Sequence, residues 1–456
     1  GRASMQIVRR PGWGMFSVGR AGSYRALVTP PADDPTPGGD PVDSMTPAER
    51  AVGAMLSEAH NTAAHQLPAM ARRHVAAFGG KDAVCYVADL QQTELVPFLE
   101  PDGPGTGEFV ESLNIDSTLA GRAYQQGQVL VQQGSGPDST VWLPLLDGTE
   151  RLGVLAVTVV RDVADELAQE PGVAVLRRFA SLLGELIMTK TLYGDTIVRL
   201  RRQSSMGLAA EMQWSLLPPL TFSCREVTVT AALEPAYEVA GDTFDYAVDA
   251  GTAKVAVFDG MGHGLQSAQL AAMAVSAYRH SRRAGRSLIA TCREVDEALL
   301  QTFPGAPFTT AVLAELDTGA GVLRWINAGH PEPLLLRQGR LVKTLTAKPR
   351  PPLGMRLPTP SGGASVLTPT IGSEQLEPGD CVLLYTDGVT EARSPDGDFF
   401  GEQRLGDLIV RNLAAGLPPP ETMRRVVRAL LDHQQGRLTD DASLALIQWQ
   451  PEPTGM

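Results

Sequence analysis

Apolar residues recur along this chain either with the period of a helix, about 3.6 residues, or with that of a strand, about two residues. The changes from one period to the other divide the chain into segments. A capping box formed by Thr46 and Glu49 opens a helical pattern that predicts one long helix to about Phe78. Strand-like runs then dominate between 84 and 160, including a hairpin that turns at 147–148. A long helix followed by antiparallel strands and a closing helix predicts an α+β domain over 45–190.

The helical pattern returns at Gly172 and continues to Leu217, where two prolines end it. It contains three apolar residues spaced seven apart: Leu186, Tyr193 and Leu200. This spacing favours a dimeric seam, which Lys190 and Ser204 interrupt. We therefore expect a homodimer and a continuous linker helix, assigned to 191–218 between the domains, that carries conformational changes from one domain to the other.

Strand and helix periods alternate in the remainder, 219–450, which we assign to a second domain. Helices are expected over 266–284 and 287–303. Strands are expected over 228–233, 244–248, 254–258, 310–317, 321–327, 334–337, 381–386 and 443–447. Two helices with many antiparallel strands predict an αββα sandwich.

Composition narrows the class of protein. A chain of 456 residues is too long for one core, and 1–44, rich in Gly, Pro, Arg and Asp, is expected to be a flexible tail. The net charge of -12 argues against nucleic acid or an anionic membrane as the main partner. No apolar run approaches the length of a membrane span, so a soluble, cytoplasmic protein is expected. The four cysteines lack the spacing of a metal finger.

Aspartates occur at the ends of four predicted strands in the second domain. They are Asp242, Asp259, Asp387 and the pair Asp440 and Asp441. Any one of them would most often be a turn former or a helix cap. Four such positions together predict a site for a hard divalent cation, because Mg²⁺ and Mn²⁺ prefer oxygen ligands.

Several motifs in this half of the chain occur together in a familiar order. They are GDTFD at 241–245, DGMGHG at 259–264, FTTAVLAELD at 308–317, NAGHPEPLLL at 327–336, LLYTDGVTEAR at 383–393 and DDAS at 440–443. In order and spacing the chain from about 213 to 448 resembles the SpoIIE-type branch of the metal-dependent serine/threonine protein phosphatases, which are protein phosphatase 2C-like. The resemblance implies the same αββα fold.

The resemblance also implies a site with two Mn²⁺ or Mg²⁺ ions. Asp242 and Asp259 would ligate the ion pair, and the carbonyl of Gly260 would complete part of the shell. Asp387 and Asp440 would complete the set of one ion, with Asp441 left open as the alternative to Asp440. Two such ions can activate a shared water for in-line attack on phosphorus, so no covalent nucleophile is needed.

Other polar residues near these motifs have weaker claims to a role. His263 is either a proton donor or part of a glycine-shaped loop, and we favour the loop. His330 more often fits a packed turn than a catalytic acid. Asp245 is expected to support the metal ligands, and Glu238 to be solvated. Ala240 stands where the family usually has glycine, and Thr243 and Phe244 replace its usual aromatic pair.

The resemblance implies a phosphoserine or phosphothreonine protein phosphatase. Its substrate would be a phosphorylated STAS-domain anti-sigma-factor antagonist in a partner-switching pathway. The segment 45–190 resembles a GAF domain more weakly, either as a sensor of an unknown small-molecule or redox signal or as a dimerisation module with a filled core. Two alternatives remain for the whole chain: an inactive signal-binding scaffold with a phosphatase fold, and a hydrolase of small phosphoesters.

Overall fold

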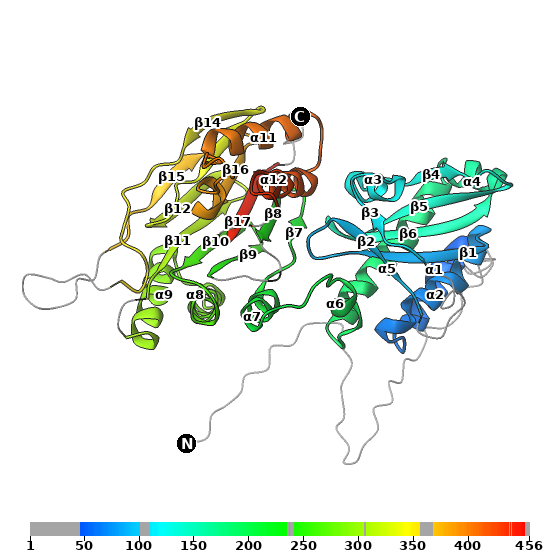
Figure 1. Ribbon diagram of the computed structural model, residues 1–456, viewed down its shortest axis with the longest axis horizontal. Helices are drawn as coiled ribbons and strands as arrows, with labels where there is room; N and C mark the ends of the chain where they lie inside the picture. The colour runs from blue at the N-terminus through cyan, green and yellow to red at the C-terminus, as the bar shows by residue number, and fades with distance from the viewer. Residues whose placement is uncertain are drawn as a thin grey trace, which may run out of the picture. The chain divides into compact units, whose positions relative to one another are not determined.

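The computed structural model describes residues 46–100, 110–234, 237, 241–304, 307–355, 368–436, 438 and 440–451. The predictions for the tail, for Glu238 and for Ala240 lie outside the described residues. Two regions with separate sheets follow each other along the chain, an N-terminal region over 46–200 and a C-terminal region over 208–451 (Figure 1). Within the described part of the chain, no helix is both long and apolar enough to cross a membrane.

The N-terminal region is built on one antiparallel sheet with the strand order β3-β2-β1-β6-β5-β4. Its strands are β1 (Asp82–Ala88), β2 (Glu94–Phe98), β3 (Leu113–Asn114), β4 (Leu130–Gln133), β5 (Asp138–Asp147) and β6 (Glu150–Val160). The hairpin predicted at 147–148 is confirmed as β5 paired with β6. The α+β class predicted for this region is therefore correct.

Helices pack on both faces of this sheet. The larger core lies against α1 (Pro47–Ala59), α2 (Leu67–Val75) and α5 (Gly172–Thr191). On the opposite face, under α3 (Leu119–Gln126), the side chains of Tyr86, Tyr124 and Trp142 pack together. Large aromatic side chains in that space favour the filled-core alternative for this domain, whereas its resemblance to a GAF domain stays a prediction.

The single long helix predicted from Thr46 to Phe78 is wrong. Its start is as expected, since the Glu49 amide donates to the Thr46 hydroxyl at 3.2 Å and the Glu49 carboxylate accepts from the Thr46 amide at 2.9 Å. The helix ends at Ala59, however, and α2 begins anew with Pro68 in its first turn. Proline lacks the amide that would continue a preceding helix and clashes with the carbonyl four residues before it.

The continuous linker helix is also wrong. The chain from 172 to 217 forms three helices, α5, α6 (Thr196–Leu200) and α7 (Leu208–Leu216). Gly194 and Gly207 lie in the two breaks, and glycine is the poorest helix former after proline. The expected seam is broken as well, because Leu186 is 9% exposed in the protein's own core whereas Tyr193 is 79% exposed in a turn. The homodimer stays a prediction.

The C-terminal region contains two antiparallel sheets packed face to face. One has the order β15-β12-β11-β10-β9 and the other β14-β13-β16-β17-β8-β7. The strands of the first are β9 (Asp242–Asp249), β10 (Thr252–Gly260), β11 (Thr309–Asp317), β12 (Val322–Ala328) and β15 (Gly372–Gln375). Those of the second are β7 (Thr221–Ser223), β8 (Val227–Glu234), β13 (Leu334–Arg337), β14 (Arg340–Thr344), β16 (Cys381–Tyr385) and β17 (Ala442–Trp449). One apolar core fills the space between the two sheets.

Helices cover the outer faces of both sheets (Figure 1). The helices α8 (Leu265–Arg283) and α9 (Leu288–Thr302) pack on the first sheet, as expected from the sequence. The helices α11 (Glu402–Ala414) and α12 (Pro419–His433) pack on the second. The predicted αββα sandwich is therefore confirmed, although the sequence analysis did not predict α11 and α12.

Candidate metal centre

Two aspartates face each other across neighbouring strands at one edge of the sandwich. Strands β9 and β10 are antiparallel, and Asp242 is the register partner of Asp259. Directly opposite residues in such a pair share a face of the sheet, with Cβ atoms about 4.5–5.5 Å apart. Like charges at opposed positions are destabilising. The fold therefore places two carboxylates where they repel unless a proton or a cation lies between them.

Asp242 is held by segments that are far apart in the sequence. Its side chain is 3% exposed, and its Oδ2 accepts a hydrogen bond from the Thr386 hydroxyl at 2.6 Å. The same hydroxyl accepts from the Ser443 amide at 2.8 Å. On the other side, the Gln213 side chain in α7 donates to the Asp242 carbonyl at 2.7 Å. These contacts fix both the carboxylate and the main chain of this residue.

The carboxylates raise one another's pKa values. Burial, followed by the charges of Asp259 and Asp441, raises the pKa of Asp242 well above its usual range. Burial, followed by Asp387 and Asp440, raises the pKa of Asp259 to about 7. The pKa of Asp387 is raised by burial and then by Glu391 and Asp440. The predicted site residues are thus close enough to interact, and they concentrate negative charge at one edge.

The neighbours Asp440 and Asp441 have different surroundings. The Oδ2 atom of Asp441 accepts from the Gly241 amide at 2.7 Å and from the Asp242 amide at 3.4 Å, and its side chain is buried. Asp440 is exposed, with Oδ1 accepting from the Asp441 amide at 2.9 Å. Because Asp441 is engaged with the backbone ahead of Asp242, Asp440 is the better placed of the two to meet an ion.

Two glycines allow the chain to approach itself closely at this edge. A Cβ atom on Gly241 would lie 2.1 Å from the carbonyl oxygen of Gly260. A Cβ on Gly388 would lie 1.9 Å from the carbonyl oxygen of Asp441. Only glycine fits such approaches. The glycines beside Asp242 and Asp387 therefore bring together the segments that carry the aspartates.

The two histidines differ in environment. His330 is buried, its main chain is bracketed by the Asn327 side chain, and its Nδ1 lies 2.7 Å from the Thr310 hydroxyl. That hydroxyl donates to Asp259 at 3.3 Å, and burial lowers the pKa of His330 to about 3. The packed-turn interpretation of His330 fits this geometry. His263 is exposed in the loop between β10 and α8.

The role expected for Asp245 is corrected. Its side chain is 1% exposed and forms ion pairs with Arg279 at 2.7 Å and Arg282 at 2.8 Å. Arg279 also donates to the carbonyl of Leu216 at the end of α7. Asp245 therefore ties β9 to α8 and does not support the metal ligands, because it stands three residues after Asp242 in the strand and so points to the opposite face of the sheet.

The carboxylate oxygens at this edge are the type of ligand that a hard divalent cation prefers. Among the described residues, no group of three or more His, Cys, Asp or Glu side chains converges as a ready-made cage. Mg²⁺ does not need one, because it keeps several waters and is usually bound through one or two carboxylates. The opposed pair Asp242 and Asp259 supplies the carboxylates, and the raised pKa values indicate an excess of negative charge that a cation would offset.

Three residues that position this edge were not predicted from the sequence: Thr386, Thr310 and Gln213. Thr386 and Thr310 lie within the motifs at 383–393 and 308–317, but their partners, Asp242 and Asp259, lie 144 and 51 residues away. No local pattern identifies Gln213, since its partner Asp242 lies 29 residues further along the chain.

Comparisons with known proteins agree with the motifs. Residues 249–450 match the family model described as Stage II sporulation protein E (SpoIIE). The chain is 35% identical over 136 residues to Protein IcfG of Synechocystis sp., covering 30% of this chain and 20% of that protein. It is 24% identical over 247 residues to the phosphoserine phosphatase RsbU of Bacillus subtilis, covering 54% of this chain and 70% of RsbU. It is 26% identical to the phosphoserine phosphatase RsbP of the same organism, covering 42% of this chain and 47% of RsbP.

Solved structures with a similar C-terminal region have TM-scores below 0.5 and carry no argument by themselves. One holds the RsbU and RsbW domains of Rv1364c from Mycobacterium tuberculosis, at 25% identity and a TM-score of 0.42, covering 51% of this chain and 63% of that one. Another is the SiaA-PP2C domain of Pseudomonas aeruginosa, at 23% identity and a TM-score of 0.44, covering 53% and 94%. Over residues 249–450 the C-terminal region is therefore similar to the SpoIIE family, and the motifs from DGMGHG at 259–264 to DDAS at 440–443 lie within this match.

Proposed function

We propose that this chain is a metal-dependent protein phosphatase that hydrolyses phosphoserine or phosphothreonine. The observation that carries the proposal is the opposed pair Asp242 and Asp259, a costly arrangement of like charges that a divalent cation would stabilise. The similarity to RsbU and RsbP, which are named phosphoserine phosphatases, supports the same reaction class. An inactive scaffold would have no need to keep such a repulsive pair.

The ligands in this proposal are Asp242, Asp259, the carbonyl of Gly260, Asp387 and Asp440, which would hold two Mn²⁺ or Mg²⁺ ions. When bound, the ions would activate water for attack on phosphorus and offset charge on the phosphoryl oxygens. Thr386 orients the Asp242 carboxylate through a hydrogen bond of 2.6 Å. Asp441 holds the main chain before Asp242 through the Gly241 amide.

The proposal assigns no proton transfer to His330. Burial keeps its pKa far below neutral, so the ring is uncharged near pH 7 and its Nδ1 is engaged with Thr310. Thr310 in turn donates to Asp259. His330 and Thr310 together are therefore suited to hold the Asp259 carboxylate in place.

We further propose a phosphorylated STAS-domain anti-sigma-factor antagonist as the substrate, within a partner-switching pathway. The motifs of the chain resemble those of phosphatases of that kind, and two relatives are named phosphoserine phosphatases. The N-terminal region would act as a GAF-like regulatory domain with an unidentified ligand, in a homodimer. The chain spans a fifth of Protein IcfG and under half of RsbP.

The test uses the full chain with Mn²⁺ and two substrates, a panel of phosphorylated STAS-domain proteins and a generic aryl phosphate. We expect metal-dependent release of phosphate from at least one phosphoprotein and from the aryl phosphate. The variant Asp387→Asn should lose both activities, whereas Asp396→Asn, a change at an exposed turn, should keep both. Turnover of the aryl phosphate alone would favour a small-phosphoester hydrolase, and bound metal without turnover would favour a scaffold.

A further inference from the structure

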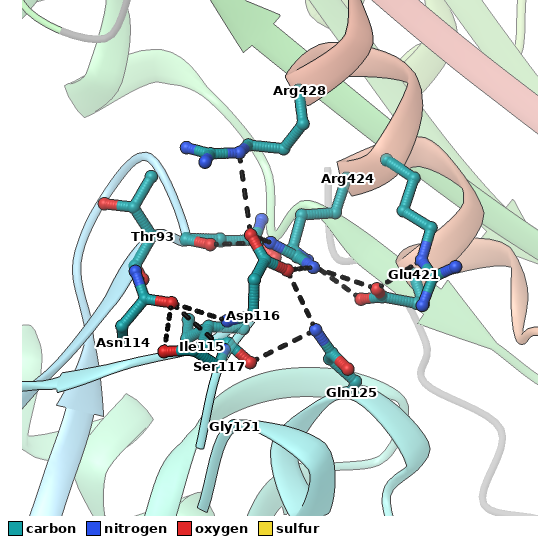
Figure 2. Close-up of polar contacts among 12 residues, drawn as sticks. Thr93, Asn114, Ile115, Asp116, Ser117, Gly121, Gln125, Glu421, Arg424 and Arg428 are labelled. Atoms are coloured by element: carbon teal, nitrogen blue, oxygen red, sulfur yellow. Dashed lines mark hydrogen bonds and ion pairs between the residues drawn. The ribbon is translucent and has the colours of Figure 1, made fainter.

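Four charged side chains meet near the start of α12, two from each region of the chain, and Figure 2 shows three of them, Asp116, Glu421 and Arg424. We call this set the ion-pair cluster: Asp116, Arg151, Glu421 and Arg424. Arg151 donates to Glu421 at 2.8 Å, and Arg424 donates to the two oxygens of Glu421 at 2.9 and 3.0 Å. Arg424 also pairs with Asp116. Glu421 is fully buried, and Arg151 and Arg424 are 7% and 4% exposed.

The cluster is balanced in charge and densely hydrogen-bonded. Burial alone would raise the pKa of Glu421, but Arg424 and Arg151 outweigh it and the net pKa is lowered. The pKa of Asp116 is lowered chiefly by its hydrogen bond to Arg424. Both carboxylates are therefore ionised near neutral pH, and they pair with the two buried guanidinium groups and also with the more exposed Arg425 and Arg428. Removing one partner of such a buried set is costly because it leaves an uncompensated charge.

Each half of the cluster keeps partners of its own if the two halves separate. On α12, Glu421 pairs with Arg424 and also with Arg425, at the i+3 and i+4 positions. In the N-terminal region, Arg151 donates to Gln92 at 3.0 Å and lies over the ring of Tyr124, 4.7 Å from its centroid. Separation would leave Glu421 paired with cations of its own helix, and would leave Arg151 and Asp116 with the neutral partners Gln92, Tyr124 and Gln125. This arrangement suits a contact that opens and closes.

The helix α12 connects the cluster to the candidate metal centre. Its apolar face, which includes Met423, Val426 and Leu430, packs in one core with residues of β17. The chain leaves α12 at His433 and reaches Asp440 seven residues later, directly before β17. A helix of 15 residues is a rod about 22 Å long. The helix and β17 are therefore packed together between the cluster and the segment that contains Asp440 and Asp441.

We propose that the ion-pair cluster is a reversible latch: when closed, it fixes α12 and so holds the Asp440 segment in the arrangement that the metal ligands need. Opening the latch loosens that segment and lowers the affinity for the metal. This regulation rests on the proposed phosphatase function. The closed state is the competent one, because in this structure, where the latch is closed, Asp441 already holds the backbone ahead of Asp242.

The test removes only the N-terminal half of the latch, in the full chain. The double variant Asp116→Ala/Arg151→Ala leaves the internal pairs of α12 untouched. The matched control is Asp138→Ala/Arg161→Ala in the same region, where Asp138 pairs with Lys81 at an exposed site and Arg161 donates to two loop carbonyls. We expect hydrogen–deuterium exchange in peptides covering 419–433 to become at least about tenfold faster in the double variant and to stay unchanged in the control.

The second measurement is the Mn²⁺ concentration that gives half-maximal phosphatase activity. We expect it to rise by about 5- to 150-fold in the double variant, the size of a usual allosteric coupling, and to stay unchanged in the control. Faster exchange with an unchanged or lower Mn²⁺ requirement would overturn the coupling, and unchanged exchange would overturn the latch itself. If the double variant does not fold, Asp116→Asn weakens the latch less severely. We then expect smaller increases in the exchange rate over 419–433 and in the Mn²⁺ requirement.

The exchange experiment does not depend on the proposed activity. If the unaltered chain hydrolyses no phosphoester, the proposed function fails, and Mn²⁺ affinity measured by calorimetry takes the place of the activity measurement. Weaker Mn²⁺ binding in the double variant than in the control would then still support the latch, and equal binding would overturn it.

Discussion

The protein contains two clusters of charged side chains, and they are built on opposite principles. At the candidate metal centre the described charges are carboxylates that raise one another's pKa values, with Asp242 opposed to Asp259. In the ion-pair cluster two carboxylates meet two guanidinium groups, and the pKa values of Asp116 and Glu421 are lowered. The first cluster consists of like charges, whereas in the second each carboxylate meets guanidinium groups.

This difference distinguishes a site that binds a ligand from a contact that holds two regions together. A repulsive cluster is unfavourable to folding and is retained where a ligand compensates it, so it marks a site of binding or catalysis. A balanced cluster is complete without a ligand, so its position between two regions indicates docking. The same residue types thus lead to different functions, depending on the sign of their neighbours.

The change with the largest expected effect breaks the repulsive cluster. In Asp259→Asn the loss of a metal ligand should lower phosphatase activity by more than the ~100-fold typical for residues that only support ligands. In metal-free protein at a pH above 7, the same change should raise the midpoint temperature of thermal unfolding. Folding raises the pKa of Asp259 to about 7, so above that pH its charged form destabilises the folded state. A phosphatase assay with Mn²⁺ measures the loss of activity, and differential scanning calorimetry of the metal-free proteins measures the rise in the unfolding midpoint.

Asp249→Asn is the matched control for this change, since Asp249 lies exposed at the other end of β9. It should alter neither activity nor the midpoint. A metal-free Asp259→Asn protein that is less stable than the unaltered chain would contradict the like-charge account of this edge.

The second change breaks the balanced cluster and should have the opposite effect on stability. Glu421→Ala leaves Arg151 and Arg424 buried without their common carboxylate, which should lower the free energy of unfolding by about 3–5 kcal/mol. Urea unfolding measures this loss. Arg425→Ala removes a partner of the same carboxylate that is 44% exposed, and should cost under about 1 kcal/mol. Equal losses in the two variants would show that burial does not set the cost.

The third change concerns Glu150, which precedes Arg151 in the chain. Like Arg151, it contacts the C-terminal region, but no ion pair neutralises it among the described residues. Its carboxylate accepts from the Thr221 amide at 2.6 Å, and burial raises its pKa from 4.5 to about 7 despite Arg201. A carboxyl pKa raised on folding favours the folded state at low pH, and this contribution is lost as pH rises through about 7.

Glu150→Gln keeps the acceptor and removes the charge. Relative to the unaltered chain, it should gain roughly 1–3 kcal/mol of stability between about pH 5 and about pH 8. Parallel urea titrations at the two pH values measure the gain, and Glu166→Gln, at an exposed position, should show none. Parallel stability curves for Glu150→Gln and the unaltered chain would refute the raised pKa.

The repulsive cluster was accessible from sequence and the balanced one was not. Asp242, Asp259 and Asp387 each stand beside a glycine at the end of a strand, so local patterns were enough to predict the carboxylates at the strand ends, whereas their roles as metal ligands were implied by the family resemblance. The partners in the latch, Arg151 and Glu421, are 270 positions apart, and no local signal links them. Only the packing of the two regions brings them together.

The helices show the same limit. The apolar spacing of Met423, Val426, Val427 and Leu430 in α12 is a helical signal that could have been found. The breaks at Gly194 and Gly207 were not predicted, because a glycine in a helical pattern is often tolerated and tertiary packing decides whether the helix ends. The error over Asp245 has a similar cause, since its arginine partners in α8 lie 34 and 37 positions further along the chain.

The smallest expected effect tests whether the metal centre needs a titratable group besides its carboxylates. His263 is exposed in a loop where Gly262 and Gly264 have φ values of 96° and 76°, so the glycines, and not the histidine, shape the turn. His263→Ala should therefore keep activity within about tenfold, whereas a general acid would contribute ~10²- to 10⁴-fold.

A comparison of two substrates tests this role directly, because a serine leaving group needs a proton far more than an aryl leaving group does. If His263 supplies that proton, the variant loses turnover of the phosphoprotein and keeps turnover of the aryl phosphate. Equal, small losses on both substrates would leave the carboxylates and their ions as the whole of the chemistry at this edge.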